Sequence, residues 1–365
     1  MFNFQKRIDS LRAVMKENRL DAFVTSFLPH IRYLTGFCGS NALCILTRSE
    51  EVVLTDFRYK EQIHNEVRDA KSFVVDGSLF AAAAKRNLFN KCKRVGFEKD
   101  HLVFGAFAEL KKESHRSIRT GKDCRWIPVS DIVESIASIK DEEEISCIKR
   151  AAAISDVVFS EILSRMRAGI SECDVAAEIS YLQRQHGAES DSFEAIVASG
   201  IRGALPHAKP TPRKIRKGEM VTLDFGCVYR GYCSDLTRTI AFGTPKPAAR
   251  KIYSIVLDAQ RKAIEAARPG LSARLLDATA RSFITSKGYG NFFGHGLGHG
   301  IGLQIHESPK ISSSSADMIR LGNAITIEPG IYIRGIGGVR IEDDVVIRRE
   351  GPEVITTSPK ELIVV

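Results

Sequence analysis

Residues 221–239, with the sequence VTLDFGCVYRGYCSDLTRT, most constrain what this chain can fold into. They predict two short strands joined by a tight turn, each carrying one aspartate, Asp224 or Asp235, among apolar and β-branched neighbours. With Tyr229 and Arg230 as the loop, the predicted register pairs Asp224 directly with Asp235. Directly opposed side chains lie about 4.5–5.5 Å apart at Cβ. Two carboxylates that close need a shared proton or a cation between them; the alternative is that both face solvent.

Three histidines follow in a glycine-rich segment, GHGLGHGIGLQIHE, at residues 294–307. The glycine density disfavours a helix and lets backbone and ligand approach closely. In an extended backbone His295 and His299 would share one face, and His306 would lie on the other. The segment lacks the G-x-G-x-x-G spacing of a dinucleotide-binding loop. We therefore expect these histidines to serve a different kind of site.

Two glutamates, Glu328 and Glu342, lie within otherwise apolar strands, AITIEPG and GVRIEDDV. A buried carboxylate without a partner is costly, so each glutamate needs one. Arg340 precedes Glu342 by two residues on the same predicted strand face. It is the expected partner, either as an ion pair or as a residue that orients Glu342 as a metal ligand.

The charges of these residues balance a dinuclear metal centre. Asp224, Asp235, Glu328 and Glu342 carry four negative charges and His299 adds a neutral nitrogen, which matches two divalent cations. Oxygen-rich ligation with one nitrogen suits Mn²⁺, with Co²⁺ and Zn²⁺ as alternatives. Two such ions hold a water, lower its pKa and clamp an attacked carbonyl. The sequence therefore predicts a hydrolytic metal site.

The remaining pattern predicts two α/β domains in a chain of 365 residues. Residues 1–133 alternate short apolar runs with helical patterns, which is typical of a layered α/β domain. Residues 134–365 open with a long helix capped by Asp141 and Glu144. The motif RAGIS at 167–171 returns as RPGLS at 268–272. This repeat predicts a duplicated α/β half and a pseudo-twofold axis in the second domain.

Composition limits the binding partners and the cellular compartment that we expect for this protein. The net charge is +9, but basic residues are interleaved with acidic ones and no nucleic-acid motif is present, so we expect no nucleic-acid partner. The sequence contains no run of 18 apolar residues, so it predicts no membrane-spanning helix. The pattern of the amino terminus predicts an amphipathic helix and not a signal peptide. Eight cysteines without C-x-x-C pairs favour a reducing, cytoplasmic location.

The motifs LDFG, YCSDLTRT, GHGLGHGIGLQIHE, TIEPGIY and GVRIED resemble those of the pita-bread metallopeptidases, which include aminopeptidase P, prolidase and methionine aminopeptidase. The resemblance covers residues from about 135 to 365. It implies that Asp224 holds one metal ion and that Asp235 and Glu342 bridge both ions. It further implies that His299 and Glu328 hold the second ion.

The resemblance also implies substrate contacts. LPH at residues 205–207 resembles the segment that carries a catalytic histidine, here His207, and His306 resembles the second catalytic histidine. His295 resembles the histidine of the proline pocket. Glu328 is the expected proton shuttle to the leaving proline nitrogen, and Arg340 is expected to contact the substrate.

The amino-terminal motifs YLTGF and LTDFRY resemble the first domain of aminopeptidase P and prolidase, which methionine aminopeptidases lack. The resemblance therefore implies hydrolysis of Xaa-Pro peptides by metal-hydroxide attack, within a homodimer. Prolidase-like members place an arginine after the His-Glu pair to hold the dipeptide carboxylate, whereas this chain has Lys310, which lacks the bidentate fork. We therefore expect an Xaa-Pro aminopeptidase, with an Xaa-Pro dipeptidase as the alternative and a non-catalytic pita-bread binding protein as a more distant one.

Overall fold

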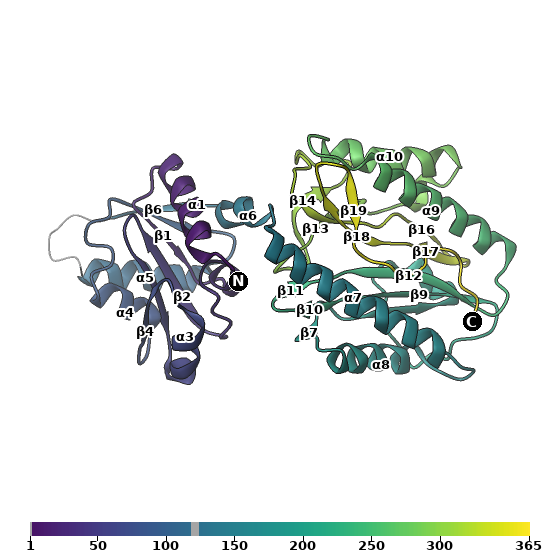
Figure 1. The fold of residues 1–365 in the computed structure, drawn as a ribbon, viewed down its shortest axis with the longest axis horizontal. Helices are drawn as coiled ribbons and strands as arrows, with labels where there is room; N and C mark the ends of the chain where they lie inside the picture. The colour runs from purple at the N-terminus through teal and green to yellow at the C-terminus, as the bar shows by residue number, and fades with distance from the viewer. Residues whose placement is uncertain (1, 118–123) are drawn as a thin grey trace. The chain divides into compact units, whose positions relative to one another are not determined.

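The computed structural model describes residues 2–117 and 124–365, and these form two compact units, residues 1–137 and 138–365 (Figure 1). The expected boundary between residues 133 and 134 falls inside the last helix of the first unit, α6 (Ile132–Ala137). No helix among the described residues is both long and apolar enough to cross a membrane. All eight cysteines are free thiols.

The first unit contains a six-stranded mixed sheet in the order β4-β3-β2-β1-β5-β6. Its strands are β1 (Ala22–Thr25), β2 (Ala42–Thr47), β3 (Glu51–Thr55), β4 (Lys71–Val74), β5 (Arg94–Glu98) and β6 (Arg125–Val129). Its helices are α1 (Phe4–Glu17), α2 (Leu28–Thr35), α3 (Lys60–Glu66), α4 (Leu79–Lys85), α5 (Phe104–Ser117) and α6, with a 3₁₀ turn η1 (Phe57–Tyr59). The apolar runs of the sequence predicted β1–β5, and the helical patterns predicted α1, α3, α4 and α5, whereas β6, α2 and α6 were missed.

Strand alternation divides the first unit into two cores. Ile45 and Leu54 pack with α4 and α5 on one face of the sheet. Their neighbours Cys44 and Val53 pack with α2 and α3 on the other face. Because successive side chains of a strand point to opposite faces, an apolar run without alternation requires cover on both sides. The result is the layered α/β domain that the sequence predicted.

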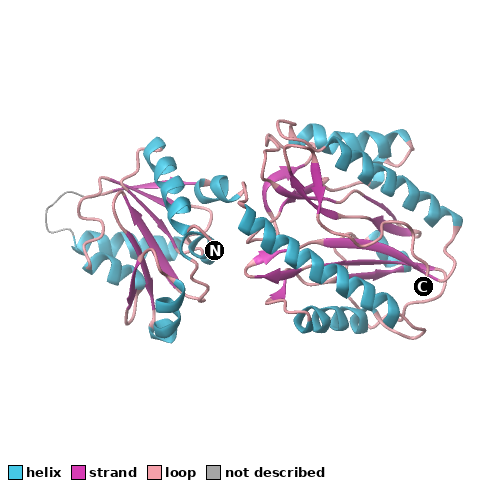
Figure 2. Cartoon of the chain, viewed as in Figure 1, coloured by secondary structure: helices cyan, strands magenta, loops and turns pink. Residues whose placement is uncertain are grey.

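The sheets of the second unit contain fewer strands than the sheet of the first unit, and helices lie on their outer faces, as Figure 2 shows. Its helices are α7 (Glu142–Arg165), α8 (Glu172–Gln185), α9 (Pro247–Ala266) and α10 (Ala273–Ser286), with the 3₁₀ turns η2 (Gly200–Ala204) and η3 (Gly290–Phe292). Its strands are β7 (Ser190–Asp191), β8 (Ile196–Ser199), β9 (Glu219–Phe225), β10 (Cys227–Tyr229), β11 (Tyr232–Cys233), β12 (Leu236–Phe242), β13 (Gly298–Gly300), β14 (Glu307–Ile311), β15 (Ala324–Ile327), β16 (Gly330–Ile333), β17 (Gly337–Arg340), β18 (Asp343–Ile347) and β19 (Pro352–Val354).

The two RxGxS motifs occupy matching places in this unit. Each follows a long helix, and Gly169 and Gly270 both have φ +85°. Ser171 and Ser272 are the N-cap residues of α8 and α10. The Ser171 side chain completes a capping box, whereas Ser272 makes no side-chain cap. One apolar core gathers α7, α8, β8, β9 and β12, and a second gathers α9 and α10 with β15–β18, so the halves predicted from the repeat are present.

The aspartate hairpin forms, but its predicted register is wrong by two residues. Tyr229 pairs with Tyr232, so the loop consists of Arg230 and Gly231, with φ of 49° and 86°. A two-residue loop with both φ positive matches the right-handed strand twist, and glycine favours it. Asp224 consequently pairs with Thr237, and Asp235 lies in the break between β11 and β12.

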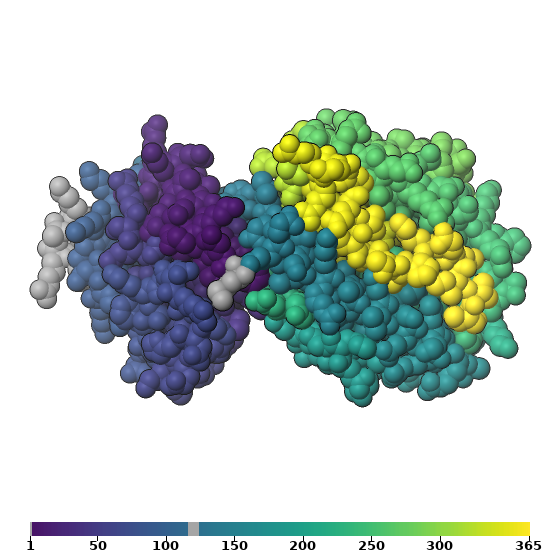
Figure 3. All heavy atoms as spheres, in the orientation of Figure 1, coloured from purple at the N-terminus to yellow at the C-terminus, as the bar shows by residue number. Residues whose placement is uncertain are grey.

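The carboxyl-terminal residues, yellow in Figure 3, cross the visible face of the second unit. Asp156 of α7 accepts hydrogen bonds from the backbone and hydroxyl groups of Thr357 and Ser358. Tyr253 of α9 donates to the Lys360 carbonyl, 2.8 Å away. Ala241 of β12 then donates its backbone N–H to the Ile363 carbonyl and accepts from the Val365 N–H, each at 2.9 Å. This segment therefore connects the two halves on which the site is built.

Candidate metal centre and active site

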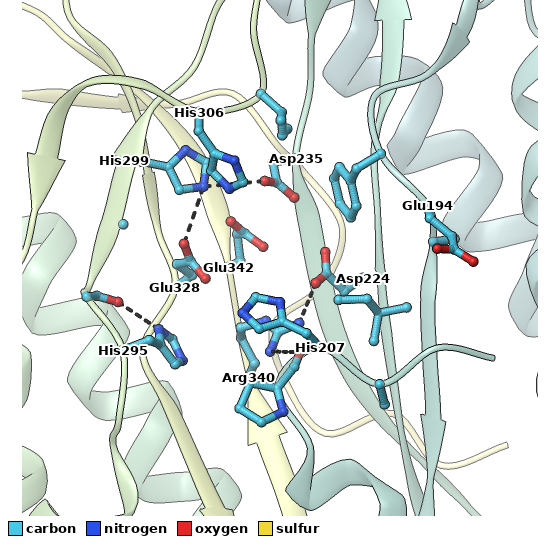
Figure 4. Close-up of a pocket in the computed structure, with 18 of the residues that line it drawn as sticks. Glu194, His207, Asp224, Asp235, His295, His299, His306, Glu328, Arg340 and Glu342 are labelled. Atoms are coloured by element: carbon cyan, nitrogen blue, oxygen red, sulfur yellow. Dashed lines mark hydrogen bonds and ion pairs between the residues drawn. The ribbon is translucent and has the colours of Figure 1, made fainter. Parts of the chain in front are cut away.

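A cavity of about 430 Å³ lies within the second unit, and the acidic and imidazole side chains predicted from the sequence line it (Figure 4). Strand ends and strand breaks supply most of them. Asp224 belongs to β9, Asp235 precedes β12, and Glu328 directly follows β15. Glu342 lies between β17 and β18, and His299 is in β13. Residues separated by more than 100 positions thus meet because both halves direct strand ends toward one cavity.

His299 faces two of these carboxylates. Its Nδ1 donates to the Gly300 carbonyl at 3.0 Å, which leaves the Nε2 lone pair directed into the cavity. Nε2 lies 3.7 Å from Asp235 Oδ2 and 3.4 Å from Glu328 Oε1. Burial lowers the pKa of His299 to about 4, so the ring is neutral at pH 7. A neutral imidazole held in this tautomer is the form that binds a metal ion.

His306 lies beside His299, which corrects the expectation that the two would face opposite ways. The ring centroids are 4.4 Å apart at an interplanar angle of 73°. Residues 301–306 are not extended, because the chain turns back and pairs Gly300 with Glu307. A Cβ on Gly300 would lie 2.2 Å from the Ser308 carbonyl oxygen, so this turn requires glycine there.

Arg340 is paired with Asp224, and the expectation that it would pair with Glu342 is wrong. Its Nη2 donates to Asp224 Oδ2 in a short, buried hydrogen bond. Strand β17 ends at Arg340, so the alternation that would place residues 340 and 342 on one face does not continue. Thr237 donates to Glu342 Oε2 instead. Arg340 therefore orients a different carboxylate of the same cavity.

Three of the carboxylates each keep one buried oxygen without a hydrogen-bond partner in the described part of the chain. These atoms are Asp224 Oδ1, Asp235 Oδ1 and Glu342 Oε1. A neighbouring aspartate, Asp344, shows the same feature at Oδ1 and accepts from the Asp235 backbone N–H at 2.9 Å through Oδ2. Buried polar atoms are normally satisfied, so unpartnered oxygens in one cavity call for another ligand.

The carboxylates also perturb one another electrostatically. Burial and the charges of Glu342 and Asp224 raise the pKa of Asp235 well above its usual value. Burial and the charges of Glu328 and Asp224 do the same to the pKa of Glu342. Burial raises the pKa of Glu328 to about 8, with Arg340 opposing the shift. Without added positive charge these shifts favour the protonated carboxyl groups, whereas a bound cation would favour the carboxylates and displace protons.

The donor set therefore fits divalent metal ions. Asp235, His299 and Glu342 each offer one ligand atom, and these atoms lie within 4.8 Å of one another. Asp224 and Glu328 line the same cavity and add further carboxylate oxygens. Buried carboxylates with unpartnered oxygens beside an oriented neutral imidazole match the needs of cations that prefer oxygen with one nitrogen.

A hydrogen-bond chain fixes His295 on the cavity wall. Arg340 Nη1 donates to Tyr332 Oη at 2.8 Å, Tyr332 donates to His295 Nε2 at 2.8 Å, and His295 Nδ1 donates to the Gly296 carbonyl at 2.7 Å. Burial and the nearby Arg340 charge lower the pKa of His295 to about 4. Tyr332 ends the TIEPGIY motif but was not predicted as a site residue, because its hydrogen-bond partners are 8 and 37 residues away in the chain.

The two remaining predicted residues occupy different environments. His207 is exposed and lines the cavity together with Pro206, whose carbonyl accepts from Arg340 at 3.2 Å. Lys310 is exposed and is not among the residues that line the cavity. Its backbone N–H donates to Asp317 Oδ2 at 2.7 Å. Nine of the ten predicted site residues thus line this cavity, and Lys310 lies outside it.

Comparison with known proteins shows the family to which this chain belongs. Residues 146–349 match the profile of metallopeptidase family M24, and residues 7–139 match that of the creatinase/prolidase N-terminal domain. The chain belongs to metallopeptidase family M24. The predicted fold class, a creatinase-like α/β domain followed by a pita-bread domain, is confirmed, and the chain is a metallopeptidase.

Three similar proteins cover nearly all of the chain. An Xaa-Pro dipeptidase of Pyrococcus horikoshii is 36% identical over 98% of this chain and 99% of its own. The structure of an Xaa-Pro dipeptidase from Bacillus anthracis is 42% identical, with a TM-score of 0.94 over 100% of both chains. The structure of an X-Pro aminopeptidase from Thermotoga maritima is 36% identical, with a TM-score of 0.89 over 97% of this chain and 100% of that one.

Proposed function

We propose that this chain is a metal-dependent Xaa-Pro dipeptidase, which hydrolyses dipeptides whose second residue is proline. The observation that carries the proposal is the cluster of buried carboxylates with unpartnered oxygens around the neutral His299 in one cavity. Two of the three relatives above are named dipeptidases, which favours this alternative over the aminopeptidase activity that the sequence suggested. The Thermotoga maritima relative supports the aminopeptidase as the second candidate.

The proposed ligands of two divalent ions are Asp224, Asp235, His299, Glu328 and Glu342. When bound, such ions lower the pKa of a water and polarise the carbonyl that it attacks. We propose Mn²⁺ as the native metal because four carboxylates and one imidazole form an oxygen-rich donor set. Arg340 and Thr237 support this set by holding Asp224 and Glu342 in place.

Other residues of the cavity would handle the substrate. His306 and His207 are exposed at the cavity and can reach a scissile carbonyl, where a hydrogen bond stabilises the developing oxyanion. The neutral His295 ring would pack against the proline side chain. Glu328 would give a proton to the proline nitrogen as the C–N bond breaks. Proline has no N–H, so recognition cannot rely on one, and its nitrogen must gain a proton to leave.

The free carboxylate of a dipeptide needs a cation, and the structure offers two lysines for this role. Lys310 follows the His-Glu pair in sequence but lies outside the cavity lining. Lys209 lines the cavity, is exposed, and pairs with Glu194 at 3.2 Å. Arg340 lines the cavity too, but its guanidinium already donates to Asp224, Tyr332 and Pro206. Lys209 is thus an added candidate that sequence analysis did not consider.

The test compares kcat/KM for Ala-Pro, Ala-Pro-Ala and Ala-Ala after the purified protein is loaded with Mn²⁺. A higher value for Ala-Pro than for Ala-Pro-Ala supports the dipeptidase. The reverse order would establish the aminopeptidase. Cleavage of Ala-Ala at the same kcat/KM as the proline peptides, or no cleavage of either proline peptide, would reject both the dipeptidase and the aminopeptidase.

Lys209→Ala and Lys310→Ala identify the carboxylate partner within the same assay. A hydrogen bond to a charged group contributes about 1.5–3 kcal/mol, so loss of the partner should raise KM for Ala-Pro roughly tenfold or more. The other lysine variant serves as the matched control and should leave KM unchanged. An effect on Ala-Pro-Ala of the same size would show that the lysine does not recognise the dipeptide carboxylate.

Assembly and location complete the proposal. We propose a homodimer, as the family resemblance implies, and analytical ultracentrifugation of the metal-loaded protein measures its mass. We also propose a cytoplasmic location, which the eight free cysteines support because thiols persist in a reducing compartment.

A further inference from the structure

A second cluster of metal-ligand side chains lies in the first unit and shares no residue with the cavity described above. It consists of His30 in α2, His101 in the loop after β5, and Glu134 in α6. One ligand atom from each of these residues lies within 4.8 Å of the others. His101 Nε2 is 2.9 Å from Glu134 Oε1, and His30 Nε2 is 3.7 Å from the same oxygen. Three separate segments therefore direct donor atoms at one point.

The surroundings of His30 orient it as a ligand. Its Nδ1 makes a short hydrogen bond to Glu98 Oε1 at the end of β5, and both residues are buried. Donation from Nδ1 to a carboxylate leaves the Nε2 lone pair facing Glu134. A carboxylate that holds the far nitrogen of a histidine is the usual support of a metal-bound imidazole. His299 is oriented in the same way, since its Nδ1 donates to a carbonyl and its Nε2 faces carboxylates.

A hydrogen-bonded network alone does not account for the cluster. Glu134 Oε2 and Glu98 Oε2 are buried and have no hydrogen-bond partner among the described residues. Glu98 as a whole is only 5% exposed. A buried carboxylate oxygen without a hydrogen-bond partner is destabilising. Glu98 contacts His30, and Glu134 contacts both His30 and His101. The Phe27 ring stacks on His101 with centroids 3.8 Å apart, which holds the imidazole in place beside Glu134.

We propose that His30 Nε2, His101 Nε2 and the Glu134 carboxylate bind one zinc ion, which is distinct from the metal ions of the catalytic unit. Two imidazoles and one carboxylate are a well-suited donor set for Zn²⁺, and the fourth position is open to water. Glu98 accepts a hydrogen bond from the other ring nitrogen of His30, Nδ1, and is not a ligand. The ion joins α6, the last helix of the first unit, to α2 and to the loop after β5. The proposal does not depend on the peptidase activity.

Zinc stoichiometry of the full-length protein tests the proposal. The chelator-treated protein is titrated with Zn²⁺ against a chromophoric chelator, and bound metal is counted by elemental analysis. An Asp235→Asn, Glu342→Gln variant weakens the catalytic set, so its remaining tight site should be the new one. In that background Glu134→Gln should remove one equivalent of zinc or weaken its binding at least about a hundredfold. Loss of a residue that merely hydrogen-bonds to a metal ligand already lowers metal affinity about 10–100-fold.

Two further variants keep the result interpretable. Glu134→Gln preserves the shape of the side chain and can still hydrogen-bond to His101, and His101→Gln provides a second removal should the first unfold. His64→Ala removes an exposed histidine of α3 in the same unit and should leave the zinc count unchanged. Zinc should also raise the Tm of the background variant but not that of its Glu134→Gln derivative. A background variant that binds no zinc tightly, or a count unaffected by both removals, would overturn the proposal.

Discussion

Two adjacent acidic residues, Glu342 and Asp343, show how this fold treats buried carboxylates in two different ways. Both are nearly inaccessible to solvent. Asp343 accepts hydrogen bonds from four side chains, at 2.7–2.8 Å: Arg238, Gln260, Thr356 and Lys360. Burial alone would raise the pKa of Asp343, but Arg238 and Lys360 lower it. Glu342 has one hydroxyl partner and one unpartnered oxygen, and its pKa is raised.

This difference distinguishes carboxylates that stabilise the fold from carboxylates that are available to bind a ligand. A carboxylate whose oxygens are all satisfied by the protein contributes to the fold, because its partners would be left buried and unpaired without it. A carboxylate whose oxygen is left unpartnered destabilises the empty protein and is ready for an external cation. The following predictions compare these two behaviours, with thermal or denaturant unfolding of metal-free protein as the common measurement.

The largest effect is expected from Asp343→Asn. It leaves Arg238 buried without its charged partner, and breaking such a pair costs about 3–5 kcal/mol in the free energy of unfolding. Glu142→Gln is the matched control, since it breaks an ion pair with Arg348 in which Glu142 is 76% exposed. The control should change stability by less than about 1 kcal/mol. Equal losses in the two variants would contradict the assignment of Asp343 to the fold.

Glu342→Gln should give the opposite stability result. At pH 7 the metal-free variant should be as stable as the parent or more stable, because a buried carboxylate beside like charges is replaced by a neutral amide. Its kcat/KM for Ala-Pro after Mn²⁺ loading should fall at least about a hundredfold, since the loss of a residue that only hydrogen-bonds to a metal ligand already costs about 10–100-fold. Near-parental turnover would remove Glu342 from the proposed ligands.

The stability of the metal-free protein should fall as pH rises from 6.5 to 8. The pKa of Glu328 is about 8 in the fold against 4.5 normally, so across this range the folded state holds a proton that the unfolded state has lost. His295 and His299, with pKa values of about 4, affect stability only below about 6.5. Between pH 6.5 and 8 this one proton should lower the free energy of unfolding by about 1–2 kcal/mol. Glu328→Gln should make this pH dependence shallower, and an unchanged slope would contradict the assignment of this proton to Glu328.

The smallest effect is expected from Tyr332→Phe. The variant removes the hydroxyl that links Arg340 to His295 and leaves the metal ligands untouched. We expect kcat/KM for Ala-Pro to fall about fivefold through a higher KM, because an ordinary buried hydrogen bond contributes about 1 kcal/mol. Tyr253→Phe, which loses a hydrogen bond to the Lys360 carbonyl outside the cavity, is the control for stability. A lower kcat at unchanged KM would mean that Tyr332 acts on the reacting groups.

Local patterns of the sequence determined much of this protein. Apolar runs placed five strands of the first unit, and Asp141 with Glu144 marked the start of α7 by the capping box that forms there. The repeated RxGxS motif located the two halves of the second unit. The five proposed ligands followed from acidic residues and a histidine inside apolar or glycine-rich strands, where a lone charge is costly. Each of these signals is carried by residues close together in the chain.

Only the tertiary structure decided how the side chains are paired. The Arg230-Gly231 loop set a register that opposes Asp224 to Thr237, and the end of β17 turned Arg340 toward Asp224. The turn after β13 brought His306 beside His299. The cluster of His30, His101 and Glu134 was invisible to motif analysis, because its residues come from three segments without shared spacing. Burial and hydrogen-bond partners depend on contacts between distant residues, and these exist only once the chain has folded.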